Sequence, residues 1–311
     1  MVDPAIVGGG VLLLALLVDR LVGDPQSPYH PVALLGRLID VWGRPERWPA
    51  RWHRPVGVVC AVATIALFAI PFILCAHLGP LLLLLAGPLF LKACFAWRAL
   101  EEHAAAVERA LSLDLQDARK KAGLLVSRDT SPLNDEQVRS AAYESVAENL
   151  VDSITAPLLY FSVLGLGGAA AYRAVNTMDA MLGYRDERLR LGWAAARLDD
   201  ILGFIPARVT GVVLLTWFTA IGRGPQAWRT LRADRRKRPG FNGGIPMALI
   251  AGGVGVAFEK PGIYQIGTPE MTLAAGGPHI VRAVRAATIG TVVLCLITLF
   301  LWAALANRIQ L

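Results

Sequence analysis

Long apolar runs dominate the hydrophobic pattern of the chain. They cover residues 5–18, 56–78, 80–97, 154–172, 201–222 and 286–306, with polar segments between them. A helix crosses a bilayer in about 20 residues, so the pattern predicts an all-α, polytopic membrane protein with about 4–6 membrane helices and polar helical loops. No internal repeat or long linker divides the chain, and little suggests a β-domain. We therefore expect a single integral-membrane domain over residues 1–311.

Two of these runs have an ambiguous relation to the membrane. The run 154–172 contains Pro157 and several glycines, and the run 201–222 contains Arg208. If both runs crossed the bilayer, the loop between them, with its five arginines, would lie outside, against the positive-inside rule. The alternative, which we favour, is that both segments are re-entrant or tilted and line a cavity. Broken backbone and buried charge are tolerated there because protein or water surrounds them.

Composition narrows the class of protein further. Hydrophobic residues make up 55% of the chain and charged residues only 18%, against about 25% charged in an average soluble domain, and the mean hydropathy is +0.49. These values argue against a soluble enzyme and exclude intrinsic disorder. The four cysteines all lie in apolar runs without a CxxC pair, which argues against a disulfide scaffold or a zinc site.

The charge distribution predicts the orientation in the membrane. The net charge is +7, and most cations fall in the loops 23–53, 98–153 and 223–285. The positive-inside rule places these loops in the cytoplasm. The positive charge therefore reflects topology, and we expect no nucleic-acid partner.

The first polar cluster lies where the first apolar run ends. Asp24 precedes Pro25, which restricts it to extended backbone, and His30 follows shortly after. One interpretation is a capped helix end followed by a loop. The other is a carboxylate and an imidazole that a stiff loop holds at the membrane surface for chemistry.

The second cluster contains Arg128 and Asp129 and then three carboxylates at helical spacing. Glu144, Glu148 and Asp152 fall at i, i+4 and i+8, so a helix beginning near residues 132–136 places them on one face. The helix runs toward the apolar run at residue 154, and carboxylates near a bilayer need cations, either arginine or a divalent metal such as Mg²⁺. A solvated helix face is the alternative.

The third and fourth clusters flank the loop 173–200. Arg173, Asn176 and Asp179 step by three along one side of a helix. Asp199 and Asp200 are adjacent, so they cannot share one helix face. At least one of them should therefore pair with a nearby arginine.

The fifth cluster is the basic run 232–238 followed by a glycine-rich turn that contains Asn242. Such a turn can cradle an anion with backbone N–H groups. The chain has no GxxxxGK[ST] loop and no GxGxxG fingerprint, so nucleotide chemistry needs an unfamiliar phosphate site. The five clusters gather at membrane exits instead of at mid-bilayer, which favours an enzyme acting on a charged, phosphorylated substrate over a pore.

Taken in order, the polar motifs extend along nearly the whole chain. They are Gly23-Asp24-Pro25 through His30-Pro31 to Gly36-Arg37, Arg128-Asp129-Thr130, Glu144-Ser145 with Glu148-Asn149 and Asp152, Tyr172-Arg173 with Asn176-Thr177-Asp179, and Asp199-Asp200 with Pro206-Ala207-Arg208. In this order and spacing the series resembles the adenosylcobinamide-phosphate synthases of cobalamin biosynthesis, the CobD/CbiB family.

The resemblance implies an activity and a setting. The family joins a propionate of adenosylcobyric acid to the amine of (R)-1-amino-2-propanol or of its O-phosphate, with ATP and Mg²⁺ as cofactors. It implies a multi-pass protein of the bacterial inner membrane whose active site faces the cytoplasm. The lipid bilayer and other membrane enzymes of the cobalamin pathway are the partners that we expect beside the substrates.

With this resemblance we assign roles to the polar residues as hypotheses. His30 or Asp24 is the candidate base, Arg128 and Arg208 are candidate phosphate clamps, and Asp199 and Asp200 form either a second metal site or an arginine-paired support. The expected catalytic residues are Asp24, His30, Arg128, Asp129 and Glu144. The expected cofactor-binding residues are Arg128, Asn176, Asp179, Arg208 and Asn242, and the expected metal ligands are Glu144, Glu148, Asp152, Asp199 and Asp200.

Two other classes of function compete with this interpretation. One is a non-catalytic membrane sensor on the same scaffold, similar to the AmpE proteins, but signalling alone does not need such matched arginine and carboxylate clusters. The other is a small-solute transporter, which predicts paired broken helices with ionisable residues at mid-bilayer and often an inverted repeat. Only Arg208 partly fits that pattern.

The orientation can be tested by cysteine labelling in intact cells. The turn around His77 carries no Lys or Arg, so we predict that a membrane-impermeant thiol reagent labels a cysteine placed at His77. A cysteine placed at Glu101 should stay unlabelled until the cells are opened. Ready labelling at Glu101 in intact cells would overturn the predicted orientation.

Overall fold

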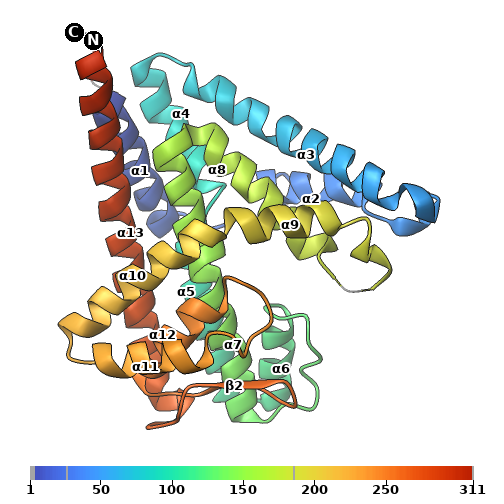
Figure 1. Ribbon diagram of the computed structural model, residues 1–311, viewed down its shortest axis with the longest axis vertical. Helices are drawn as coiled ribbons and strands as arrows, with labels where there is room; N and C mark the ends of the chain where they lie inside the picture. Colours follow the sequence, from blue (N-terminus) through green and yellow to red (C-terminus); the bar gives the residue numbers. More distant parts are fainter. Residues whose placement is uncertain (1–3, 26, 185, 310–311) are drawn as a thin grey trace. The chain divides into compact units, whose positions relative to one another are not determined.

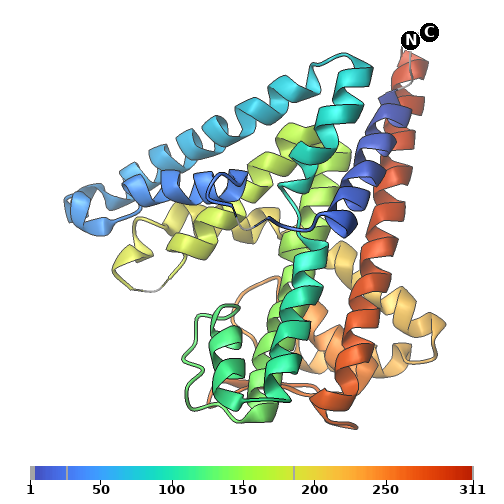
Figure 2. The same cartoon turned by 180° about the vertical axis from the view of Figure 1, so that it is seen from behind.

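The computed structural model describes residues 4–25, 27–184 and 186–309. Nearly all of its regular structure is helical, which confirms the predicted all-α fold (Figures 1 and 2). The chain forms two compact units. Unit 1 comprises Met1–Ala96, Ala156–Gly203 and Val292–Leu311, and unit 2 comprises Trp97–Thr155 and Phe204–Thr291. The single domain expected over residues 1–311 stays a prediction.

Unit 1 consists of apolar helices joined by short polar segments. Its helices are α1 (Pro4–Leu21), α2 (Pro31–Trp42), α3 (His53–Ala76), α4 (Pro80–Lys92), α8 (Ala156–Leu182), α9 (Trp193–Leu202) and the last part of α13 (Leu273–Ile309). Short 3₁₀ turns η1 (Pro45–Arg47), η2 (Ala50–Trp52) and η4 (Glu187–Leu189) lie in the connections.

Close helix packing builds the core of unit 1. Helix α3 packs against α8, and α1 packs against α4. Leu35 and Ile39 of α2 meet Val175 and Met178 of α8 in a buried apolar cluster. A Cβ atom at Gly57 of α3 would lie 2.1 Å from the backbone oxygen of Leu191, so only glycine allows this approach.

Unit 2 combines helices with one short hairpin. Its elements are α5 (Trp97–Leu111), α6 (Leu115–Gly123), α7 (Asp135–Leu150), the π-helical turn η3 (Val151–Thr155), α10 (Phe204–Ala220), α11 (Gly224–Asp234), α12 (Gly244–Val254), β1 (Phe258–Lys260), β2 (Tyr264–Ile266) and the first part of α13. The strands pair antiparallel with Glu259 opposite Gln265, and β1 packs on α7. This hairpin was not expected from the sequence.

The chain from α7 into α8 is helical, with two local irregularities. The π-turn η3 ends just before Pro157. In a regular α-helix, Pro157 would have no N–H to donate to the carbonyl of Ser153, and its ring would crowd that carbonyl. Further along, Gly165 has φ 67° and ψ −162°, outside the helical region. Only glycine adopts this conformation without strain, so the expected break in the glycine-rich run is present.

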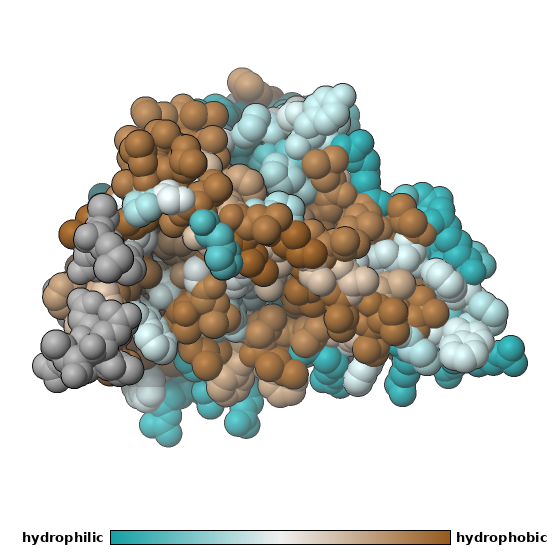
Figure 3. Space-filling model, turned by 90° about the horizontal axis from the view of Figure 1, so that it is seen from above, coloured by the Kyte–Doolittle hydropathy of each residue, from teal (hydrophilic) through white to brown (hydrophobic). Residues whose placement is uncertain are grey.

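Among the described residues, five helical segments are long and apolar enough to cross a membrane, within the predicted number. They are Ala50–Ala76, Pro80–Leu111, Asp135–Leu182, Trp193–Ala220 and Leu273–Leu305. Large hydrophobic side chains cover much of the surface seen in Figure 3, which a soluble protein would not expose. The chain is therefore a multi-pass membrane protein. Both runs that were ambiguous in the sequence belong to these five segments.

Candidate functional site

Glu144 is the centre of a polar cluster in unit 2. It lies on α7, whose start is fixed by a capping box: Gln137 N donates to Asn134 Oδ1 over 2.9 Å, and Asn134 N donates to Gln137 Oε1 over 3.2 Å. Two helical turns later, Glu144 is only 5% exposed. A carboxylate this buried needs partners for both oxygens.

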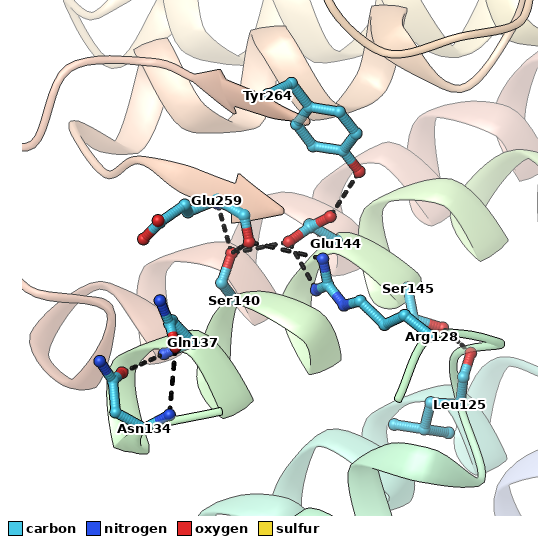
Figure 4. Close-up of polar contacts among 9 residues, drawn as sticks. All are labelled: Leu125, Arg128, Asn134, Gln137, Ser140, Glu144, Ser145, Glu259 and Tyr264. Atoms are coloured by element: carbon cyan, nitrogen blue, oxygen red, sulfur yellow. Dashed lines mark hydrogen bonds and ion pairs between the residues drawn. The ribbon is translucent and has the colours of Figure 1, made fainter. Parts of the chain in front are cut away.

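Three side chains supply these partners (Figure 4). Glu144 Oε1 accepts from Arg128 Nη2 over 2.9 Å and from the Ser140 hydroxyl over 2.7 Å, and Oε2 accepts from the Tyr264 hydroxyl over 2.6 Å. Burial, reinforced by the Glu144 charge, raises the pKa of Tyr264, so this hydroxyl remains a donor. Glu259 N donates to Ser140 Oγ over 2.6 Å, and the cluster thereby holds the hairpin on α7.

The structure joins the predicted catalytic residues Arg128 and Glu144 as a buried ion pair. Arg128 Nε is buried and makes no hydrogen bond to any described residue. Asp129 is exposed and accepts from the backbone N–H and the hydroxyl of Ser131, both over 2.9 Å. These bonds lower the pKa of Asp129, and they give it a role in shaping the turn.

The three carboxylates that were predicted to bind a metal from one face of a helix have different partners in the structure. Glu148 forms an ion pair with Arg238, and Asp152 lies half-buried in the π-turn η3, where it has a partner of its own. Regular α-helical spacing stops at Leu150, so the i+8 argument does not extend to Asp152. In the parts of the chain that the structure describes, no three His, Cys, Asp or Glu residues gather closely enough to hold a metal ion. Arginines supply the cations for Glu144 and Glu148, and the metal-ligand roles stay predictions.

Arg208 and Asn242, both expected to bind cofactor, lie together in unit 2. Arg208 Nη1 donates to Asn242 Oδ1 over 2.8 Å and to Phe204 O over 3.0 Å, and Nη2 donates to Phe241 O over 3.3 Å. The guanidinium also lies 3.5 Å from the centre of the Phe204 ring. These contacts fix the orientation of a cation beside the glycine-rich turn.

Unit 1 holds a second charged cluster, centred on Lys92. Lys92 Nζ lies 3.2 Å from Asp19 Oδ1 and 2.5 Å from Asp24 Oδ1, and it donates to Phe95 O over 3.2 Å. Lys92 is 6% exposed and Asp19 is fully buried. The sequence interpretation assigned Lys92 no role. Its position could have pointed to a role, because a cation near the end of an apolar run needs a counter-ion. Asp19 and Asp24, which lie where the first apolar run ends, are such counter-ions.

His30 lies beside this cluster and begins α2. Its Nδ1 accepts from Val32 N over 3.3 Å, and its Nε2 lies 3.9 Å from Asp24 Oδ1. Burial lowers the pKa of His30, Asp24 opposes the shift, and Lys92 and Arg173 lower the pKa further. The imidazole is therefore neutral at pH 7.

A cavity of about 500 Å³ opens beside these groups. Asp24, His30 and Lys92 are the polar residues among those that line it. Its other walls are almost wholly apolar and come from the end of α1, the start of α2 and the facing sides of α3 and α4: Val18, Val22, Leu34, Leu67, Phe68 and Phe90. Its volume falls within the range of small-molecule sites, about 300–1,000 Å³.

The remaining predicted residues lie on α8 and α9 of unit 1. Asn176 Nδ2 donates to Asp199 Oδ1 over 3.3 Å, which joins the third and fourth sequence clusters. Asp200 pairs with Arg197 at 3.8 Å, as expected for at least one of the adjacent aspartates. Asp179 is half-buried on α8 and has a partner of its own. The substrate and metal roles of these residues stay predictions.

Comparison with known proteins identifies one family. The family described as CobD/Cbib protein matches residues 12–306. A probable cobalamin biosynthesis protein CobD from Methanothermobacter thermautotrophicus is 44% identical over 83% of this chain and 86% of its own. The cobalamin biosynthesis protein CobD of Chromobacterium violaceum is 38% identical over 95% of this chain and 94% of its own. No solved structure matches.

We predict that His30 makes the stability of the protein fall in mild acid. Its pKa in the folded protein is lowered, so as the pH falls through about 6.5, the ordinary value, the unfolded chain gains a proton that the folded chain does not. His30→Asn keeps an N-cap acceptor without this titration. Thermal unfolding in detergent between pH 7.5 and 5.5 should show a smaller loss for His30→Asn than for wild type.

The exposed His279 provides the control. His279→Asn should follow wild type across the same pH range. Equal pH slopes for His30→Asn and wild type would show that His30 has no such effect.

Proposed function

The chain belongs to the CobD/CbiB family and takes part in cobalamin biosynthesis, and we propose that its reaction is ATP-dependent amide formation. The substrates are adenosylcobyric acid and (R)-1-amino-2-propanol or its O-phosphate. The observation that carries the proposal is the family match over residues 12–306, which includes every charged motif of the chain.

The chemistry requires activation of a carboxylate. A carboxylate and an amine do not condense at useful rates, so a carboxylate oxygen first attacks the γ-phosphorus of ATP, and ADP leaves. The amine nitrogen, after losing a proton, attacks the acyl carbon of this acyl phosphate, and inorganic phosphate leaves. Such a reaction needs fixed positive charge at the transferring phosphoryl group and a proton acceptor near the amine.

Arg208 is our candidate for the phosphoryl group. Its guanidinium is oriented by Asn242 and by two backbone carbonyls, and α12 begins two residues after Asn242 with no side-chain cap. A helix N-terminus and a planar guanidinium are both suited to phosphate oxygens. Arg128, whose Nε lacks a partner among the described residues, is the second candidate.

Mg²⁺ enters this proposal with ATP. In phosphoryl-transfer sites Mg²⁺ is usually held by the substrate phosphates, water and one or two carboxylates. Glu144 and Glu148 are already paired with arginines, so a metal held by both carboxylates does not fit their observed contacts. We therefore derive no step through a protein-bound metal.

The proposal is tested with the full chain purified in detergent. With adenosylcobyric acid, aminopropanol or its phosphate, and Mg-ATP, wild type should release ADP in step with the amide product. Arg208→Lys keeps the charge and loses the planar fork, so its KM for ATP should rise about tenfold or more. Mass spectrometry of the corrinoid and an ADP assay measure both.

Arg229→Lys is the matched control, because Arg229 is an exposed arginine whose Nε donates to the carbonyl of Pro225. It should retain wild-type kinetics. Full kcat/KM in Arg208→Lys would remove Arg208 from the phosphate site. Absence of ADP and amide from wild type with all substrates present would contradict the proposed reaction itself.

A further inference from the structure

The start of α3 carries two arginines that have no acidic partner. Residues 40–54 contain four arginines and only two acids, and both acids act on Arg44. Arg51 and Arg54 are exposed, and neither forms an ion pair with a residue that the structure describes. Their positive charges are therefore available to an anionic ligand.

Contacts within the chain fix the backbone that carries these two arginines. Trp48 Nε1 donates to the carbonyl of Trp42 over 2.9 Å, which ties the chain before α3 to the end of α2. The turn η2 then continues into α3 as one helical segment, Ala50–Ala76. Arg51 and Arg54 are three residues apart on this segment, so they lie on the same face. Two guanidinium groups are thus placed side by side without a ligand.

The same face of α3 continues as an apolar surface. Val58 and Val62 follow Arg54 at four-residue steps, and both are exposed. Gly57 and Ala61, on the opposite face, are buried. The segment is long and apolar enough to cross a membrane, so its exposed valines face lipid acyl chains. The arginines therefore lie at the headgroup end of a lipid-facing surface.

Two exposed tryptophans lie beside these arginines, Trp52 before Arg54 and Trp193 at the start of α9. The guanidinium carbon of Arg54 lies 5.6 Å from the centre of the Trp193 ring, within the range of a cation–π contact. The start of α9 is near because Leu191 packs on α3, where a Cβ atom at Gly57 would lie 2.1 Å from the Leu191 oxygen. Tryptophan is enriched at the boundary between membrane and water, which suits this position.

A phospholipid matches each part of this surface. Its phosphate oxygens accept hydrogen bonds from guanidinium groups, its glycerol region suits indole rings, and its acyl chains cover exposed valines. A soluble phosphate or nucleotide would leave the valines uncovered. The two unpaired cations favour a lipid of net negative charge over a zwitterionic lipid, whose own cation offsets its phosphate.

We propose that Arg51, Trp52 and Arg54 form a binding site for an anionic phospholipid. The two arginines bind the phosphate oxygens, Trp52 lies at the level of the glycerol backbone, and an acyl chain lies along Val58 and Val62. This site is separate from the proposed reaction and does not depend on it.

The test is native mass spectrometry of the full chain in detergent, with phosphatidylglycerol and phosphatidylcholine that have identical acyl chains. One arginine near an anionic lipid contributes about fivefold in affinity, so wild type should bind phosphatidylglycerol about 25-fold more tightly than phosphatidylcholine. Arg51→Gln combined with Arg54→Gln should bind the two lipids with nearly equal affinity. Equal affinities in wild type, or an unchanged preference in the double variant, would overturn the proposal.

A second double variant provides the matched control. Arg109 on α5 and Arg229 on α11 are exposed arginines outside this surface. Arg109→Gln combined with Arg229→Gln removes the same number of charges and should keep the wild-type preference. Loss of the preference in this control as well would show a general effect of net charge and would overturn the assignment to α3.

A fluorescence measurement covers the case in which the arginine variants do not fold. Lipids brominated on their acyl chains quench nearby indole rings, and the difference between wild type and Trp52→Phe gives the emission of Trp52. In phosphatidylcholine nanodiscs, brominated phosphatidylglycerol should quench this emission more than the same amount of brominated phosphatidylcholine. Equal quenching by the two lipids would contradict the site.

Glycerol 3-phosphate tests whether a soluble phosphate occupies the site instead. It carries the phosphate without acyl chains, so it should displace no phosphatidylglycerol at equal concentration. Displacement as effective as that by phosphatidylglycerol itself would assign the site to a soluble phosphate and overturn the lipid assignment.

Discussion

Charge placed in or beside apolar membrane helices must be neutralised by partners, and this constraint organises the polar part of the molecule. In unit 1, Lys92 at the end of α4 is held by Asp19 and Asp24. In unit 2, Glu144 on α7 is held by Arg128, Ser140 and Tyr264. Breaking a buried pair costs about 3–5 kcal/mol because it leaves an uncompensated charge. These pairs therefore fix the segments that carry them.

The same ion pairing leaves few buried polar atoms of the described residues without a partner. Asp24 Oδ2 and Arg173 Nε in unit 1, and Arg128 Nε in unit 2, are buried and make no hydrogen bond to any described residue. A buried polar atom without a partner is unfavourable, so these atoms would gain most from a ligand or a rearrangement that supplies one.

Much of this fold could be predicted from the sequence, because hydrophobic runs of bilayer length report directly on membrane helices. The capped start of α7 and the break at Gly165 also follow from local residue types. The partners of the charged residues could not be predicted. Lys92 and Asp24 are 68 positions apart, and Glu144 meets Tyr264 120 positions away on a hairpin too short to leave a strand pattern. Periodicity reports which face a residue occupies, and it carries no information about which distant segment packs there.

The carboxylates Glu144, Glu148 and Asp152 also show that helical periodicity does not reveal which distant residues a side chain meets. Helical spacing correctly predicted that Glu144 and Glu148 lie on one helix and need cations. The choice between arginine and metal depends on Arg128 and Arg238, which come from other segments. Asp152 lies in a π-turn, which we attribute to Pro157, because proline does not fit the regular hydrogen-bond pattern of an α-helix. Counting residues at regular α-helical spacing does not foresee such an irregularity.

A mutant cycle in detergent tests most directly whether Lys92 is stabilised by its two carboxylates. Lys92→Met leaves two acids near one another without their cation, so the thermal unfolding temperature should fall sharply. Adding Asp19→Asn and Asp24→Asn removes the uncompensated charge and should restore most of the loss, because a neutral replacement of a buried pair is tolerated. Unfolding of Lys92→Met at the wild-type temperature would contradict this stabilisation, and so would a triple variant that is no more stable than Lys92→Met alone.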